Sequence, residues 1–349
     1  MPVTIYDVAK RAGVGIGTVS RVLNESPQIS PKTREKVLKA IRELQYRPHA
    51  LARGLARNKT GMIGVVMPFF IGYFYFELLR TIQHELTQKG YDLILYNVEN
   101  PKQLDTIFEK SLRERRVDGL LILSVPISDV HAKEFHRQRF PVVLVDTTHP
   151  DLDSIKVENT QGAYTAVSYL ISLGHQRIGM ITGKLSSPPA RERVEGYKKA
   201  LTDHGIPFEP RYLLVPEIPE ADGFNRSAGY QGFKQLVSLG KERPTAIFAS
   251  SDIQAAGALL AAQELHLRIP EEMALIGFDD VELASYLGLT TMRQPLEDMG
   301  KLAVERLIER ISKKVYQVIQ HQVVPQLIIR NTSGVLSMDK VDFIMEKKT

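Results

Sequence analysis

Residues 4–24, TIYDVAKRAGVGIGTVSRVLN, have the pattern of two short helices joined by a turn that contains glycine. Thr4 and Asp7 place a hydroxyl and a carboxylate at the start of the first helix, where backbone N–H groups lack partners. Gly13 is expected to end that helix. The pattern therefore predicts a helix-turn-helix unit at the front of the chain.

The second predicted helix, from Thr18 to Leu23, has polar groups on its outer face. Its apolar residues face inward under helical periodicity, which leaves Thr18, Ser20 and Arg21 outside. A helix-turn-helix lays its second helix in the major groove of DNA, where an arginine can donate two hydrogen bonds to guanine. We therefore expect Arg21 to contact bases. The alternative is a structural helical hairpin whose arginine is only solvated.

Basic residues are concentrated at the front of the chain. Residues 1–60 contain 12 of the 45 Lys and Arg residues and 4 of the 40 Asp and Glu residues, a net charge of +8, whereas the other 289 residues carry −3. A small basic segment on a mildly acidic body is typical of a headpiece that binds a polyanion, because neutralised phosphates release counterions. A solvated basic face is the alternative, and the helix-turn-helix pattern disfavours it.

Length and composition limit the number of domains and exclude several classes of protein. A chain of 349 residues is too long for one compact core, so two or three domains are expected. The absence of cysteine excludes disulfides and cysteine-ligated zinc. The longest apolar run, residues 62–72, is broken by Pro68 and is too short to span a bilayer. The N-terminus does not resemble a secretory signal, so we expect a cytoplasmic protein.

A third helix and a short hinge are predicted next. Ser30 is a favourable N-cap for the third helix, whose apolar stripe comprises Val37, Leu38, Ile41 and Leu44. This helix closes a three-helix headpiece over residues 1–47, and a hinge follows over residues 48–60. Within the hinge, Leu51 and Leu55 share one helical face, and Leu55 could act as a wedge in a minor groove. A plain linker is the alternative for this stretch.

From Met62 onward, buried strand runs alternate with amphipathic helices in two series. The first series contains MIGVVMP, YDLILYNV, GLLILSV and PVVLVDTTH, and the second contains RIGMITG, RYLLVPE, TAIFASSD and MALIGFDD. This alternation predicts an α/β fold of two lobes, each a doubly wound parallel sheet with helices on both faces. A cleft between the lobes is the expected ligand site, because such sheets bind ligands beyond the carboxyl ends of their strands.

The last part of the chain before residue 334 is predicted to pass back through both lobes. It contains LTTMRQP, a helix over 296–313 and the strand-like segment VYQVIQHQVVPQLIIR. The body spans residues 61–333, with an N-lobe over about 61–160 and 291–322 and a C-lobe over about 161–290 and 323–333. Residues 334–349 form a polar tail to which the sequence assigns no role.

Several motifs of the chain match those of a known protein family. The chain resembles the lactose and galactose repressor family of bacterial transcription regulators over residues 3 to about 333. The matching segments are TIYDVAKRAGVGIGTVSRVLN, YRPHALARGLARNKTGMIGVVMP, LGHQRIGMITG, RVEGY, ASSDIQAAGAL and IGFDDVELASYLGLTTMRQP. The resemblance implies a ligand-responsive repressor with lobes like those of periplasmic sugar-binding proteins. It also implies a homodimer or tetramer that binds double-stranded operator DNA and responds to a small effector, a sugar or sugar phosphate.

The resemblance also implies particular DNA contacts. The arginine of the TVSRVLN segment, which contacts operator bases in the family, corresponds to Arg21, and the hinge leucine that intercalates corresponds to Leu55. Ile16 and Gly17 occupy the two positions that usually add base specificity, although Gly17 has no side chain with which to do so. The expected DNA-binding set is Thr4, Tyr6, Ile16, Gly17, Thr18, Ser20, Arg21, Asn24 and Leu55.

For the effector cleft, the resemblance points to an arginine and an aspartate. The arginine of the family's R-x-x-G motif corresponds to Arg193, the aspartate of its G-[FY]-D motif corresponds to Asp279, and Phe224 stands where a stacking aromatic is usual. The expected effector set is Tyr73, Asp146, Arg193, Phe224, Ser251, Asp252 and Asp279. The first-strand loop, PFFIGYFYFELL, departs from the family's asparagine-proline-phenylalanine pattern. Helix capping by Asp252 or Asp279 and a core position for Phe224 are the structural alternatives.

Other function classes fit the sequence less well. GVGIGTVS does not complete a G-x-G-x-x-G loop and follows no strand, and GMITGK lacks the spacing of a P-loop. Neither H-E-x-x-H nor G-x-S-x-G occurs. We therefore expect no enzyme, no cofactor and no bound metal. A sugar-binding protein without a DNA role is the alternative of a different class, and a purine- or phosphoprotein-responsive regulator is the alternative within the family.

Overall fold

The computed structural model describes residues 3–23, 26, 28–46, 59–68, 72–98, 101–216, 222–312 and 317–334. The chain divides into two units, Met1–Gly61 and Met62–Thr349. Most of the predicted hinge and all of the predicted tail after residue 334 lie outside the described residues.

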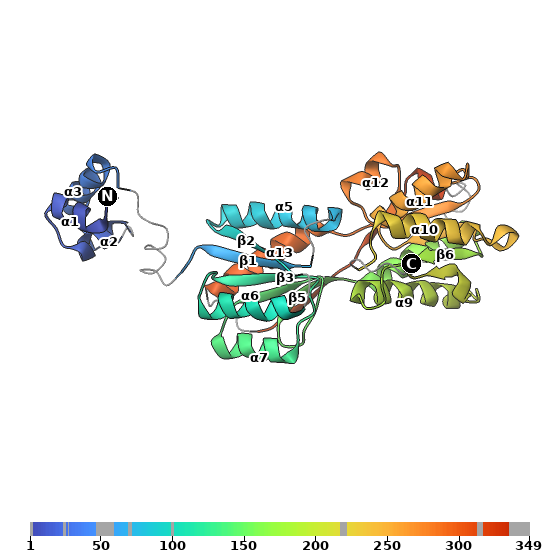
Figure 1. Ribbon diagram of the computed structural model, residues 1–349, viewed down its shortest axis with the longest axis horizontal. Helices are drawn as coiled ribbons and strands as arrows, with labels where there is room; N and C mark the ends of the chain where they lie inside the picture. Colours follow the sequence, from blue (N-terminus) through green and yellow to red (C-terminus); the bar gives the residue numbers. More distant parts are fainter. Residues whose placement is uncertain are drawn as a thin grey trace, which may run out of the picture. The chain divides into compact units, whose positions relative to one another are not determined.

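The described part of the first unit contains three helices: α1 (Ile5–Ala12), α2 (Ile16–Leu23) and α3 (Pro31–Glu43) (Figure 1). They pack around the completely buried side chains of Val8, Val19 and Val37. The predicted apolar stripe of α3 is wrong at Leu38, which is 40% exposed. Leu38 lies one residue, about 100° of helical rotation, past Val37, and this turns it off the buried face.

The two ends of α1 are fixed by the residues that the sequence singles out. The Asp7 carboxylate accepts hydrogen bonds from the backbone N–H of Thr4 (2.8 Å) and from its hydroxyl (2.7 Å). At the other end Gly13 is left-handed, with φ 65° and ψ 36°, a conformation in which a Cβ atom would be strained. The chain can therefore turn from α1 into α2 within three residues.

Two six-stranded sheets form the second unit. Sheet A has the order β11-β5-β4-β3-β1-β2 and contains β1 (Met62–Met67), β2 (Asp92–Asn97), β3 (Gly119–Leu123), β4 (Val142–Val145), β5 (Asp153–Val157) and β11 (Gln320–Val323). Sheet B has the order β12-β10-β9-β8-β6-β7 and contains β6 (Ile178–Ile181), β7 (Leu213–Leu214), β8 (Ala246–Ala249), β9 (Ala274–Asp279), β10 (Thr290–Arg293) and β12 (Gln326–Ile328). The described pairings are parallel, except that β12 is antiparallel to β10. We call the two halves the N-lobe and the C-lobe.

Helices cover both faces of each sheet (Figure 1). In the N-lobe, α5 (Tyr73–Gln88) and α13 (Leu296–Ile311) cover one face, and α6 (Pro101–Arg113) and α7 (Asp129–Gln138) cover the other. In the C-lobe, the pairs are α8 (Asn159–Ser172) with α9 (Pro188–Asp203) and α10 (Arg226–Val237) with α11 (Asp252–Glu264), while the short α12 (Glu282–Tyr286) follows β9. Alternate residues of β3 join opposite cores, Leu121 toward α5 and Leu120 toward α6. This confirms the predicted pair of doubly wound lobes, whose central strands must be apolar on both faces.

Among the described residues, the chain passes between the lobes after β5, after β10 and after β11. The strand-like segment near the end of the body splits, with β11 in sheet A and β12 in sheet B. The predicted strand runs omit β5, whose sequence DSIKV is too polar to resemble a buried strand. Its Asp153 is nevertheless buried, because Arg306 and Arg310 of α13 hold its carboxylate at 3.0 and 2.6 Å.

Candidate functional site

The outer face of α2 is open to solvent as the sequence predicts. Ile16, Gly17 and Arg21 are exposed, and Thr18 and Ser20 are partly buried. A Cβ atom built on Gly17 would meet nothing within 4 Å, so this position presents bare backbone. Within the described part of the chain, no side chain is paired with the Arg21 guanidinium, which leaves its donors available to a partner.

Two further predicted DNA contacts lie at the start of α1. Tyr6 is 68% exposed on the surface of that helix. Thr4 is also exposed, although its hydroxyl is already used in the hydrogen bond to Asp7. The predicted contacts Asn24 and Leu55 lie outside the described residues.

Residues that end or follow strands gather at the junction of the two lobes. Ser124 follows β3, Asp146 follows β4, and Asp279 ends β9. Their φ angles of 52°, 56° and 123° are positive, which is uncommon outside glycine and concentrates at functional sites. The carboxyl ends of both sheets thus supply polar side chains to one place, where doubly wound folds bind ligands.

Arg193 of α9 is the buried cation of this junction, with 4% of its surface exposed. Its Nε donates to the Asn159 side chain at 2.8 Å, and one terminal nitrogen donates to the Ser250 carbonyl. The same nitrogen lies 3.9 Å from an Asp279 oxygen. The guanidinium also stacks over the ring of Phe278, 3.7 Å from its centroid. Burial of this charge is therefore offset by hydrogen bonds, one carboxylate and an aromatic face.

Three carboxylates surround Arg193. Burial raises the pKa of Asp146 to about 6, against the opposing effects of a hydrogen bond from the Ser124 hydroxyl (2.7 Å) and of the Arg193 charge. Burial likewise raises the pKa of Asp279 to about 7, although Arg193 and the Gln294 amide (2.6 Å) favour its charged form. Burial also raises the pKa of Asp222. At each of these three carboxylates, desolvation therefore outweighs the stabilisation that nearby cations and donors give to the charged form.

Tyr75 completes this group from the N-lobe. It is buried, and burial together with the nearby charges of three aspartates raises its pKa, against the opposing effect of the neighbouring Ser124 side chain. By contrast Tyr73, the tyrosine expected from the sequence, is 48% exposed at the first position of α5. We call the following residues the cleft cluster: Tyr75, Ser124, Asp146, Arg193, Asp222 and Asp279.

The other residues expected at the effector site lie around the cleft cluster. Phe224 is partly buried, with its ring centroid 5.4 Å from the Arg193 guanidinium. Ser251 caps α11 by accepting from the N–H of Gln254 (3.3 Å). Asp252 is fully buried, and its two oxygens accept from the Val281 N–H (3.0 Å) and the Thr291 hydroxyl (2.5 Å). The oxygens of Asp252 therefore bind β10 and the start of the α12 segment.

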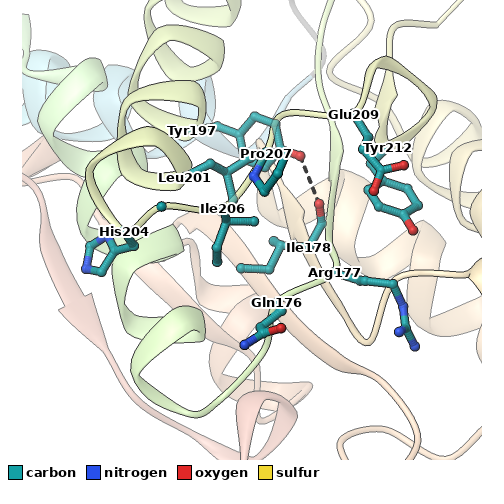
Figure 2. A pocket seen from close by; sticks show the side chains of 11 residues that line it. Gln176, Arg177, Ile178, Tyr197, Leu201, His204, Ile206, Pro207, Glu209 and Tyr212 are labelled. Carbon is teal, nitrogen blue, oxygen red and sulfur yellow. Dashed lines mark hydrogen bonds between the residues drawn. The ribbon is translucent and has the colours of Figure 1, made fainter.

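A cavity of about 300 Å³ opens beside the cleft cluster, lined by residues from both lobes that include Ile127, Asp146, Asn159 and Arg191. A second cavity, of about 270 Å³, lies at the opposite, amino-terminal end of β6 (Figure 2). Its buried hydroxyls are already satisfied, because Tyr197 donates to the Ile178 carbonyl at 2.8 Å and Tyr212 donates to the Glu242 carbonyl at 2.6 Å. These two hydroxyls are therefore not available to a ligand in the second cavity.

The sequence-based search omitted Tyr75, Ser124, Asp222 and Gln294 from the site. Ser124 and Gln294 each come directly after a strand, β3 and β10 respectively, so the carboxyl-end rule alone could have found them. Asp222 follows no strand of the described structure directly. Tyr75 lies inside α5, where only the orientation of the helix decides which tyrosine points inward.

In the described ranges, no group of three or more His, Cys, Asp or Glu side chains is arranged to hold a metal ion. None of the helices described there is both long and apolar enough to cross a membrane.

Comparison with known proteins gives matches over nearly the whole chain. Residues 4–49 match the description "Bacterial regulatory proteins, lacI family", and residues 167–333 match "Periplasmic binding protein-like domain". The ribose operon repressor of Escherichia coli (strain K12) is 37% identical over 336 residues, which cover 95% of this chain and 99% of that protein. Catabolite control protein A of Priestia megaterium is 36% identical over 320 residues, or 90% and 94% of the two chains. A solved structure of the lac repressor dimer bound to operator and the anti-inducer ONPF has a TM-score of 0.83 at 30% identity and covers 95% of this chain and 99% of that chain.

The outer face of α2 gives a first prediction. Arg21→Ala should weaken binding to a duplex selected for tight binding by about 1–3 kcal/mol and should relax discrimination at one base pair per half-site. Fluorescence anisotropy against single-base variants of that duplex measures both effects. Arg21→Lys is the matched control, because it keeps the charge and loses the two-pronged donor geometry. If the alanine variant lost affinity equally for every duplex, Arg21 would be a phosphate contact.

The cleft cluster gives a second prediction. Because the pKa of Asp146 is raised from 3.8 to about 6 in the folded protein, the folded state binds that proton more tightly than the unfolded chain does. The protonated Asp146 carboxyl therefore makes its full contribution to the stability of the fold below about pH 4. This contribution is lost as the pH rises through about 6. Asp146→Asn should gain stability over the parent across that window, by on the order of 1–3 kcal/mol. Denaturant melts at several pH values measure this.

The control for that experiment is Asp298→Asn, which removes an exposed carboxylate of α13. Its difference from the parent should not grow over the same pH window. Parallel pH profiles for Asp146→Asn and the parent would show that folding leaves the pKa of Asp146 unchanged, contrary to the argument from burial.

Proposed function

The chain belongs to the lacI family of bacterial regulatory proteins, and we propose that its operator affinity is set by a neutral sugar bound at the cleft cluster. As a member of that family it is a ligand-responsive, DNA-binding transcriptional repressor that binds operator DNA as a dimer. Beyond that family role, we propose the effector class, the individual contact residues and the mode of coupling.

The observation that supports a neutral sugar is the excess of carboxylates around Arg193. Asp146, Asp222 and Asp279 are all held in a setting that raises their pKa values, so each gains from a hydroxyl donor. A sugar presents hydroxyls at its rim, which can donate to carboxylates and accept from Arg193. Its C–H face can lie against the ring of Phe224, which borders the same guanidinium.

The same charges disfavour an anionic effector. A sugar phosphate would bring about two negative charges beside three carboxylates, and Arg193 already uses donors on Asn159 and Ser250. A purine could stack on Phe224, but it has few N–H groups to offer to carboxylates that face it from different sides. The name of the ribose operon repressor, a relative at 37% identity, agrees with a sugar.

A ligand at the cleft cluster would contact both lobes. Tyr75, Ser124 and Asp146 belong to the N-lobe, whereas Arg193 and Asp279 belong to the C-lobe. Such a ligand binds one angle between the lobes better than others and shifts the population toward it. A coupling of about 1–3 kcal/mol, typical of allosteric proteins, changes operator affinity by about 5- to 150-fold.

The headpiece residues keep the roles that the sequence suggests. We infer that Arg21 contacts bases, that Ile16, Thr18 and Ser20 flank it in the major groove, and that the backbone at Gly17 approaches the DNA closely. The exposure of Ile16, Gly17 and Arg21 on α2 and the partial exposure of Thr18 and Ser20 support the inference. Thr4, Tyr6, Asn24 and Leu55 complete the proposed set, and a protein that acts on operator DNA is inferred to work in the cytoplasm.

The proposal predicts a clear order of ligands in a thermal-shift panel. D-ribose and other neutral aldoses should raise the melting temperature, with about 2.7 kcal/mol of stabilisation at a hundred times the dissociation constant. Ribose 5-phosphate and purine bases should give smaller shifts at equal concentration. Asp279→Asn should weaken the sugar by about 1.5–3 kcal/mol, the range for a hydrogen bond to a charged group. Operator binding without ligand should persist in this variant.

Asp298→Asn again serves as the control, since Asp298 is exposed, does not line the cavity at the lobe junction and should respond to the sugar as the parent does. A larger shift with ribose 5-phosphate than with ribose would contradict the charge argument. A shift that survives Asp279→Asn undiminished would contradict the placement of the site.

A further inference from the structure

Three polar side chains connect the N-lobe to Arg193. The ammonium of Lys156 lies 2.9 Å from one oxygen of Glu192. The other oxygen of Glu192 accepts from the Asn159 amide at 3.1 Å, and the Asn159 oxygen accepts from Arg193 Nε at 2.8 Å. Glu192 and Asn159 thus each use separate atoms toward their two neighbours, and the order Lys156, Glu192, Asn159, Arg193 is continuous.

Only the first of these contacts crosses between the lobes. Lys156 lies in β5 and is paired with Gln322 of β11 inside sheet A. Asn159 begins α8, and Glu192 and Arg193 lie on α9. These two helices pack so closely that a Cβ atom on Gly196 would lie 2.2 Å from the Thr160 carbonyl oxygen. The last three members therefore move as one body of the C-lobe, and Lys156 moves with the N-lobe.

The surroundings of the pair allow the lobes to move. The side chains of Lys156 and Glu192 are 24% and 28% exposed, so the pair is less screened by water than a surface pair. Both residues, together with Asn159 and Asp146, line the cavity of about 300 Å³ at the lobe junction. Since the lobes do not fill this space, a change of angle there can separate Lys156 from Glu192 without a steric clash.

We propose that Lys156 is a positioning residue of the effector site, acting on Arg193 through Glu192 and Asn159 so that the placement of Arg193 depends on the angle between the lobes. With Lys156 in contact, the charge of Glu192 is neutralised and its second oxygen orients Asn159. When the lobes separate, Glu192 loses that cation and attracts the neighbouring guanidinium. The class of ligand that Arg193 binds rests on the proposed function, whereas the dependence of the Arg193 position on Lys156 does not.

The test measures the lobe angle directly in the full-length chain. Because the sequence contains no cysteine, Val130→Cys on α7 and Glu195→Cys on α9 give one labelled pair per chain, and both positions are exposed. Spin labels there report the distance between lobes by electron double resonance, with excess unlabelled chain to dilute labels between protomers. The ligand-free distribution is compared for the parent, Lys156→Met, Lys156→Arg and Lys199→Met.

Lys199→Met is the matched control, because Lys199 pairs with Asp203 at 2.6 Å within α9 and touches only the C-lobe. We expect Lys156→Met to add a population at longer distance and to weaken D-ribose about 2- to 5-fold, the range for loss of a partly screened ion pair. Lys156→Arg should restore the parent distribution and affinity, and Lys199→Met should match the parent in both.

The proposal is overturned if Lys156→Met and Lys199→Met give the same distance distribution, or if Lys156→Arg fails to restore the parent's. A parent that binds no sugar of the panel would refute the proposed effector class. In that case the ligand-free distances still decide the role of Lys156, because they require no effector.

Discussion

The buried guanidinium of Arg193 is the charge on which the ligand cleft depends. An isolated charge in a protein interior is strongly unfavourable, and it persists only when hydrogen bonds and opposite charges compensate it. Here Asn159, the Ser250 carbonyl and Asp279 provide that compensation, and the ring of Phe278 covers one face of the guanidinium. The arrangement fixes α9 against the ends of β8 and β9, which sets the C-lobe wall of the cleft.

The carboxylates around this cation are held in an environment that disfavours their charged forms. Burial raises the pKa values of Asp146 and Asp279 to about 6 and about 7, so their charged forms are less favourable here than in water. One residue comes from each lobe, and a polyhydroxylated ligand between them can satisfy both. In the proposed function, ligand recognition and lobe geometry both depend on this charge distribution, and the N-lobe contact from Lys156 to Glu192 is proposed to add a second connection between them.

Much of this architecture follows from the sequence, and the exceptions have physical reasons. The strand runs, the two lobes and the three headpiece helices follow from periodicity, because buried parallel strands and amphipathic helices leave strong patterns. Arg193, Asp146, Phe224 and Asp279, expected from motifs or family likeness, are brought together in the structure. The polar strand β5 is missed because the partners that compensate buried Asp153, two arginines and the Ile319 N–H, lie about 150 residues away in the chain.

The choice between Tyr73 and Tyr75 depends on the rotation of α5 about its axis, which the sequence alone did not decide. Local sequence patterns do not reveal the contact between Lys156 and Glu192 either, since it joins two elements from different lobes.

We propose that a sugar in the cleft and operator DNA at the headpiece influence each other's binding. The most direct measurement is a reciprocal titration: operator affinity with and without saturating sugar, and sugar affinity with and without saturating operator. Linkage requires the two affinities to change by the same factor, expected at about 5- to 150-fold; a sugar that binds tightly and leaves operator affinity unchanged would contradict the account.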